Sequence, residues 1–240
     1  MPIAPFNKKL AKGELMETGR IYRSGIRFVF EGVEGFVFLA FILLSWPLSR
    51  RWFGNWGANE SECKQKWAGD ALTPSATETF TRAIDIDAPA EAVWPWIIQL
   101  GLGRAGFYSY ELLEHMVGIP VKNVEVLLPA CQSLKLGEEI RLHPKAPGIP
   151  VGALSETRHI CFGQTGKTTA ATPDPRRSWS IYIEPYKQKS CRLILRSCTE
   201  DIREPTWGKH LGLAFGEPID FLMEQRMLRT IRRLVENAGS

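Results

Sequence analysis

Apolar and polar residues alternate over residues 80–86, and this period of two predicts a half-buried strand. Pro89 then marks the start of a helix, and Pro95 is expected to kink or shorten it. The glycines of GLGRAG, at 101–106, predict a corner, and a second helix is expected over about residues 108–117. This region is therefore predicted to be a strand followed by two helices.

The next hundred residues are predicted to be antiparallel sheet, because short β-prone runs are separated by turn clusters. The candidate strands are Glu138–Leu142, Ala153–Phe162, Trp179–Glu184 and Arg192–Cys198. A long final helix is expected to start at Pro218, with apolar residues at helical spacing: Ile219, Leu222, Met223, Met227, Ile231, Leu234 and Val235. The predicted fold class is α+β, in the order strand, two helices, antiparallel sheet and long helix.

One stretch departs from the pattern of a soluble protein. Residues 35–49, GFVFLAFILLSWPLS, carry no charge, and extension back to residue 28 gives the length of about 20 residues that a spanning helix needs. The extension includes Glu31 and Glu34, one turn apart, which would face head groups or a protein partner. We predict a single-pass membrane helix over residues 28–48. An interfacial helix and a buried soluble helix are the alternatives.

The borders of this stretch support the prediction, since arginines flank it and Trp46 and Trp52 lie where interfacial aromatics are common. The chain is thus divided into a basic tail at 1–27, the membrane helix at 28–48, a linker at 49–76 and a folded domain at 77–238.

Composition narrows the functional classes. The net charge is only +4, and the basic residues are not interleaved with aromatics as in nucleic-acid binders, so no nucleic-acid partner is expected. The five cysteines form no C-x-x-C pair, which argues against a zinc knuckle and a disulfide framework. Reduced thiols favour a reducing compartment, and we expect the domain on the cytoplasmic side.

Two glycine-rich motifs resemble nucleotide-binding loops. GLGRAG matches G-x-G-x-x-G, but the segment before it is predicted to be helix rather than strand. CFGQTGKT nearly matches the phosphate-binding loop, but no long helix is expected after it. We therefore predict no nucleotide, metal or other cofactor. No catalytic constellation is identifiable either, so enzyme activity is not expected, although it is left open.

Four stretches carry a resemblance to a known family: IDIDAPAEAVWPWIIQLGLGRAGFYSYELLE, LKLGEEIRLHP, SWSIYIEPYKQKSCRLILRS and EPIDFLMEQRMLRTIRRLVE. In this order they resemble the SRPBCC superfamily of START-like, helix-grip proteins, and most closely its polyketide cyclase/dehydrase-like bacterial branch. The resemblance implies a curved antiparallel sheet wrapped around the last helix, with a cavity between them.

Polar, aromatic and methionine side chains from these stretches are the expected lining of that cavity: Arg104, Tyr108, Tyr110, Arg141, Trp179, Arg192, Arg196, Met223 and Met227. The expected function is a membrane-anchored domain that binds a small hydrophobic ligand, such as a lipid, a quinone, a pigment or a polyketide-like molecule. Two alternatives remain. One is an accessory subunit of a membrane protein complex, and the other is a cyclase or dehydrase acting on an apolar substrate.

Overall fold

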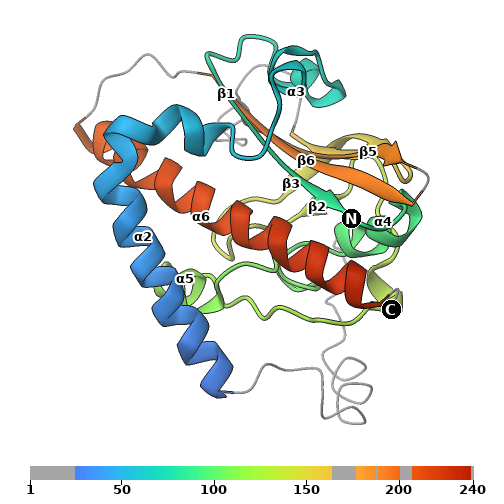
Figure 1. The fold of residues 1–240 in the computed structure, drawn as a ribbon, viewed down its shortest axis with the longest axis horizontal. Coiled ribbons are helices and arrows are strands. Elements are labelled where there is room, and N and C mark those ends of the chain that lie inside the picture. Colours follow the sequence, from blue (N-terminus) through green and yellow to red (C-terminus); the bar gives the residue numbers. More distant parts are fainter. Residues whose placement is uncertain (1–24, 164–176, 188, 201–206, 239–240) are drawn as a thin grey trace.

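The computed structural model describes residues 25–163, 177–187, 189–200 and 207–238 (Figure 1). Within these ranges only the backbone is described for Pro47, Lys187 and residues 207–215. Most of the predicted basic tail, and most of the CFGQTGKT motif, lie outside the described residues.

Six strands form one antiparallel sheet, in the order β1-β6-β5-β4-β3-β2. Their bounds are Glu78–Ile86 for β1, Glu139–Ile140 for β2, Ile149–Ser155 for β3, His159–Phe162 for β4, Arg177–Lys187 for β5 and Ser190–Thr199 for β6. The β1–β6 register runs from Glu78 opposite Thr199 to Ile86 opposite Cys191. The first strand of the domain is therefore joined to the last.

Helices cover both faces of this sheet. On one face lie α4 (Ala90–Ile98), which follows β1, and α6 (Trp207–Ala238), which crosses the sheet in Figure 1. The short helices are α3 (Glu60–Lys64), α5 (Glu111–Met116), η1 (Ala68–Leu72) and η2 (Pro129–Cys131). The predicted α+β fold class is confirmed, with an antiparallel sheet and a long C-terminal helix in the helix-grip arrangement.

Side chains alternate between the two faces of the sheet, as the period of two requires. Ile84 and Ile86 of β1 point into the main core, which also contains the buried residues of α4 and α6. Ala83, which precedes Ile84, points to the outer face and packs with Trp67 and Leu72 of the 59–73 segment. This segment thus covers the outer face of the sheet. It belongs to residues 49–76, which the sequence suggests as a linker.

Three element boundaries differ from the prediction. Residues 153–162, expected to be one strand, are a hairpin of β3 and β4, with a turn at Thr157 whose φ is +57°. No glycine, proline or asparagine marks this turn in the sequence. The final helix begins at Trp207, before Pro218. A proline inside a helix removes one intrahelical hydrogen bond, and the burial of Pro218 offsets that loss.

The third boundary is that of the second predicted helix, expected from about residue 108 and found only from Glu111. Tyr108 has a φ of +57°, which an α-helix does not allow. Asn123 holds this backbone, because its side-chain Oδ1 accepts hydrogen bonds from the amides of Phe107 at 3.0 Å and Tyr108 at 2.6 Å. A distant side chain therefore decides where the helix starts.

The N-terminal apolar segment is a single helix, α2 (Gly25–Gly54), that packs against α5, α6 and β1 (Figure 1). Residues 25–46 of α2 are long and apolar enough to cross a membrane by length and composition. The apolar helix predicted at 28–48 is present, and it continues into the residues expected to be linker.

Candidate functional site

A buried charged pair lies on the α6-facing side of the sheet. Arg82 of β1, only 1% exposed, forms an ion pair with Glu224 of α6. Arg82 Nε donates to the carbonyl of Phe53 at 3.1 Å. Glu224 Oε1 also accepts from Trp179 Nε1 at 3.1 Å and from Ser197 Oγ at 3.2 Å. We call Arg82, Glu224, Trp179 and Ser197 the inner polar cluster.

The guanidinium of Arg82 is held in apolar surroundings. The rings of Phe80 and Phe221 lie 5.5 and 5.4 Å from its central carbon. Burial lowers the pKa of Arg82 to about 10, and the carboxylates of Asp220 and Glu217 act in the opposite direction. Arg82 therefore stays charged at neutral pH. Its Nη2 has no hydrogen-bond partner among the described residues.

Apolar side chains surround the inner polar cluster. Trp179 stacks on Phe162 of β4, with ring centroids 5.5 Å apart. Met227 and Ile231 of α6 are buried in the same core. The two best-defined pockets of the described part of the chain lie at the surface of α2 and β1, not between the sheet and α6. The residues of the main core, which lie between the sheet and α6, are buried.

The aromatic and methionine residues expected to line a cavity are divided between two clusters. Trp179 and Met227 belong to the core beneath α6, and Tyr108 lies in the same core with its hydroxyl 2.6 Å from Gln99 Nε2. Tyr110 and Met223 pack instead with residues of α2 and α6. The structure thus brings only part of the predicted set together.

The four predicted arginines do not join the inner polar cluster. Arg104 Nη2 donates to the carbonyls of Ile98 and Cys131, at 2.9 and 2.7 Å, and so closes the glycine-rich corner. Arg141 is exposed. On the outer face of the sheet, Arg192 pairs with Glu62 and Asp85, and Arg196 pairs with Asp70 at 2.7 Å. The ion pairs Arg192–Glu62 and Arg196–Asp70 fix the 59–73 segment to the sheet.

The sequence interpretation missed Arg82 and Glu224. One signal for Arg82 was present, since it occupies an inward position of the alternating strand, between Phe80 and Ile84. A charge at such a position requires a partner. Glu224 had no comparable signal, because α6 carries many charged residues.

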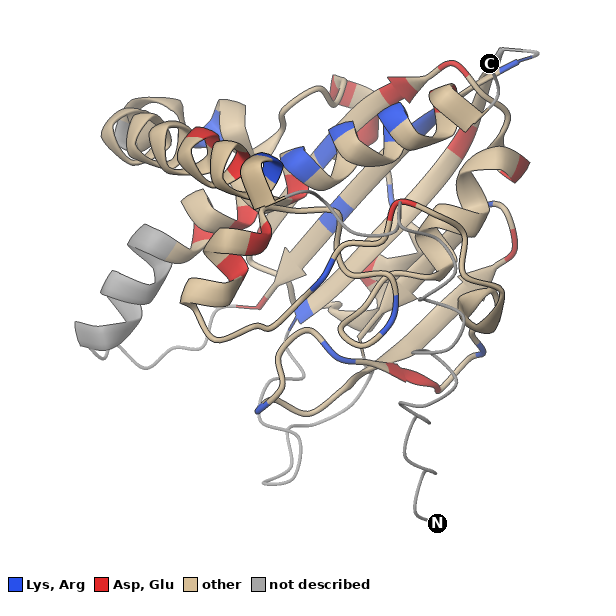
Figure 2. Ribbon diagram, turned by 90° about the horizontal axis from the view of Figure 1, so that it is seen from below, with Lys and Arg blue, Asp and Glu red and all other residues tan. Residues whose placement is uncertain are grey.

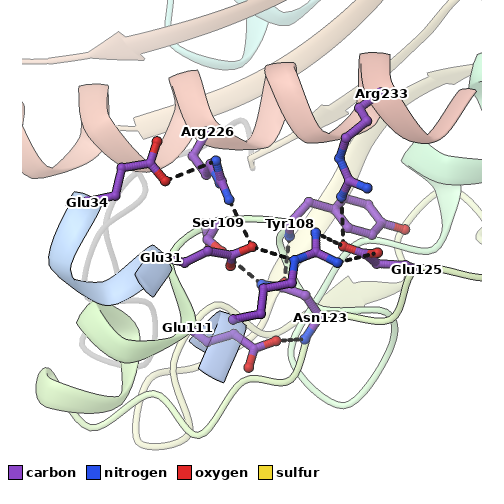
Figure 3. Close-up of polar contacts among 10 residues, drawn as sticks. Glu31, Glu34, Tyr108, Ser109, Glu111, Asn123, Glu125, Arg226 and Arg233 are labelled. Atoms are coloured by element: carbon purple, nitrogen blue, oxygen red, sulfur yellow. Dashed lines mark hydrogen bonds and ion pairs between the residues drawn. The ribbon is translucent and has the colours of Figure 1, made fainter. Parts of the chain in front are cut away.

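A second polar cluster joins α2 to the rest of the domain (Figure 3). Arg27 Nη2 and Arg233 Nη2 both contact Glu125 Oε1, at 2.9 and 2.7 Å. Arg226 of α6 contacts Glu31 at 3.0 Å and Glu34 at 3.5 Å. These six residues form what we call the α2 ion-pair cluster. The two glutamates of the apolar stretch are therefore paired within the chain, whereas the sequence suggested that they would face head groups or a protein partner.

The other end of α2 is fixed in the same way. Arg50 lies 2.6 Å from Glu217 of α6 and 2.6 Å from Glu78 of β1. Between the two ends, Ile42, Trp46 and Phe53 are buried against α5 and α6. The inner face of α2 is thus part of the domain's own packing.

Glu114 of α5 is buried and is held by a hydrogen bond from Ser109, while its Oε2 lacks a partner in the described part of the chain. Burial raises the pKa of Glu114 to about 7 from an ordinary 4.5, the bond from Ser109 opposes the rise, and the negative charge of Glu111 adds to it. The folded chain therefore binds this proton more tightly than the unfolded chain. Stability should fall as pH rises from about 4.5 to about 7, and stay level above that.

Glu114→Gln removes this charge, so the variant should be more stable than the parent above pH 7, by up to about 3 kcal/mol, with little difference near pH 4.5. Urea unfolding of both proteins across this pH range measures the effect. The exposed Glu91→Gln is the matched control and should track the parent. A difference between Glu114→Gln and parent that does not change with pH contradicts the assignment.

The GLGRAG corner connects α4 to the approach of α5, as predicted. Gly101 and Gly106 pair with each other, with Gly101 N 3.0 Å from Gly106 O, and both have positive φ. The preceding element is a helix rather than a strand. Among the described residues, no three His, Cys, Asp or Glu side chains come together in a metal-binding group.

Comparison with known proteins gives only distant structural matches. No family model matches the sequence. No curated protein matches it either. The self-sacrificing resistance protein CalC from Micromonospora echinospora matches with a TM-score of 0.40 and 11% identity, over 68% of this chain and 96% of its own. Protein Ms6760 from Mycobacterium smegmatis gives 0.39 and 13%, over 73% and 97%.

The polyketide cyclase-like protein Cgl2372 from Corynebacterium glutamicum gives a TM-score of 0.31 and 16% identity, over 68% of this chain and 93% of its own. Because these TM-scores are low, the architecture is defined by the strand order and helix packing described above, and not by the matches.

Proposed function

We propose that this chain is a membrane-attached helix-grip domain that binds a small apolar molecule carrying one polar group, between the sheet and α6. The observation that carries the proposal is the buried Arg82 Nη2, a donor on a charged group that has no hydrogen-bond partner among the described residues. An unpaired buried donor costs free energy, which a ligand acceptor would recover.

The inner polar cluster supplies the polar end of the binding site. Arg82 would donate to a carbonyl, hydroxyl or carboxylate oxygen of the ligand. Glu224 holds the guanidinium through the ion pair, and Trp179 holds Glu224 through a hydrogen bond. The stacked rings of Trp179 and Phe162 would cover the apolar body. A quinone, a lipid or a polyketide-like molecule fits this description.

Entry of a ligand requires movement, because the described side chains fill the core. The C-terminal part of α2 closes the space beside Arg82, through the carbonyl of Phe53 and the contact between the Phe53 and Phe221 rings, 4.7 Å apart. Displacement of these two rings would open a route to the guanidinium. The apolar helix would thus both attach the domain and stand at the entrance.

Attachment to a membrane through residues 28–48 is the second part of the proposal. Its support is the length and composition of α2 and the ten large apolar side chains that α2 leaves exposed. Both a crossing helix and an interfacial helix would attach the chain. We propose the cytoplasmic side for the domain, because its five cysteines are free and reduced thiols are common in reducing compartments.

The ligand proposal is tested by calorimetry of the purified full-length chain against menadione, cholesterol, palmitate and emodin. We expect one of these classes to bind, and Trp179→Ala to weaken that binding about tenfold or more, because the indole supplies contact area and holds Glu224. Leu136→Ala, at an exposed leucine outside the core clusters, is the control and should bind as the parent does. No binding by any of the four would reject the proposal.

One observation favours a different function, that of an accessory subunit of a membrane complex. The described side chains of the core are buried against one another, and a broad apolar face of α2 is exposed. In that case the chain purified from its native membrane in mild detergent would carry companion proteins and no small molecule. Mass spectrometry of that preparation separates the two functions.

A further inference from the structure

The exposed apolar side chains of α2 form one continuous surface, which we call the outer face: Ile26, Val29, Phe30, Val33, Phe36, Val37, Phe41, Leu44, Leu48 and Trp52. Leu44 is 86% exposed and Leu48 is 94% exposed. At about 100° per residue, these positions cover nearly half of the helix circumference. Glu34 stands at the edge of this surface, where Arg226 pairs with it.

The opposite face of α2 packs on the domain through buried residues that include Glu31, Gly35, Ile42, Trp46 and Phe53. A side chain at Gly32 would overlap Leu112 of α5, and a Cβ at Gly35 would come within 3.1 Å of Tyr110 and Leu113. The two glycines therefore permit the close approach of α2 and α5. Ion pairs fix the N-terminal end through Glu31 and the C-terminal end through Arg50.

This packing is incompatible with a helix that crosses the bilayer. A crossing α2 would carry α5 and α6 into the hydrocarbon beside it. Figure 2 shows basic residues along α6, which include Arg226, Arg229, Arg232 and Arg233. Charged side chains in the hydrocarbon are costly unless they are paired or reach water, and Arg229 and Arg232 are exposed.

The outer face fits a lipid surface better than a second copy of the chain. A two-helix seam uses a narrow stripe with charged residues beside it, whereas here the apolar surface is nearly half of the helix. Lipid covers a broad apolar face without requiring a matching partner. At the C-terminal end, Arg51 and Trp52 are both exposed, as is common where a helix meets head groups.

We infer that α2 lies in the plane of the membrane, with its outer face in the acyl-chain boundary and the sheet domain resting on its inner face. The inference rests on the membrane attachment proposed above and specifies its geometry. The partner is a bilayer surface with anionic head groups, which Arg51 and the exposed arginines of α6 would attract.

The first test is flotation of the full-length chain with phosphatidylcholine vesicles that contain phosphatidylserine. The double variant Val37→Glu with Leu44→Glu should lower the bound fraction about tenfold or more, because it places two charges in the apolar boundary. Leu136→Glu is the matched control, since Leu136 is 67% exposed on another part of the surface, and should bind as the parent does. The thermal midpoints of all three should agree, because the replaced side chains are exposed.

The second test measures depth. Nitroxide labels are placed at Ile26→Cys, Val37→Cys or Leu48→Cys in a Cys63→Ser background, where the remaining cysteines are buried. An in-plane helix gives three similar depths, although labels at 26 and 48 are about 33 Å apart along the axis. A label at Glu156→Cys, exposed on the β3–β4 turn, should remain in water.

The outcomes separate the inference from the function on which it rests. A much deeper Val37 label than either end would show a crossing helix, which overturns the inference and leaves the attachment intact. Absence of flotation overturns both. A lipid-free dimer that the double variant converts to a monomer, without vesicle binding, would assign the outer face to a second copy. None of these results affects the ligand measurement on Trp179→Ala.

Discussion

Met227→Asp should lower the free energy of unfolding by about 3–5 kcal/mol, the largest effect that we expect from a single substitution in this chain. Met227 is 2% exposed and lies on the face of α6 that packs on the sheet. A carboxylate there loses its hydration and gains no described partner at that position, so it must either stay charged at high cost or take up a proton.

Urea unfolding of the full-length chain measures this difference. Arg232→Asp is the control, since it introduces the same side chain on the same helix at an exposed position, and it should change stability by less than about 1 kcal/mol. Equal unfolding midpoints for Met227→Asp and the parent would mean that this stripe of α6 does not form the core. The stripe was predicted from spacing alone.

The parts of the fold that follow local periodicity could be predicted from the sequence. The alternation over 80–86 gives β1, and the spacing of Leu222, Met227 and Ile231 gives the buried face of α6. The start of α5 could not be predicted, because it depends on Asn123, whose amide holds a backbone turn many residues earlier. Likewise, the turn at Thr157 contains no glycine, proline or asparagine that would mark it in the sequence.

The candidate site was only partly predictable, for a related reason. Arg82 and Glu224 are 142 residues apart, and neither position alone reveals its partner. Arg27 and Glu125, 98 residues apart, pose the same problem for α2. Hydropathy averages over all faces of a helix, so it identified α2 as apolar but did not show that one face belongs to the domain. That distinction required the packing against α5 and α6.

Breaking the buried ion pair should produce the second large effect. Glu224→Gln keeps the shape of the side chain but removes the carboxylate that pairs with the buried charge of Arg82, and should cost about 3 kcal/mol or more of unfolding free energy. The new amide nitrogen is itself a donor, so it could not accept the hydrogen bond from Arg82 or Trp179 that a carboxylate oxygen accepts. Arg82→Met should lower the unfolding free energy by less. The charge that it leaves unpaired is that of Glu224, which is nearer to solvent than Arg82.

The double variant Arg82→Met with Glu224→Leu removes both charges and fills the space with apolar groups. Its stability should return to within about 2 kcal/mol of the parent, since a buried pair is often replaceable by packed apolar side chains. Urea unfolding of the parent, Arg82→Met, Glu224→Leu and the double variant closes a double-mutant cycle, whose coupling energy measures the interaction between the two side chains. A cycle with no coupling would contradict the buried contact. If the double variant is stable and no longer binds the ligand found by calorimetry, then the pair is kept for binding. Retained binding would instead assign Arg82 a purely structural role.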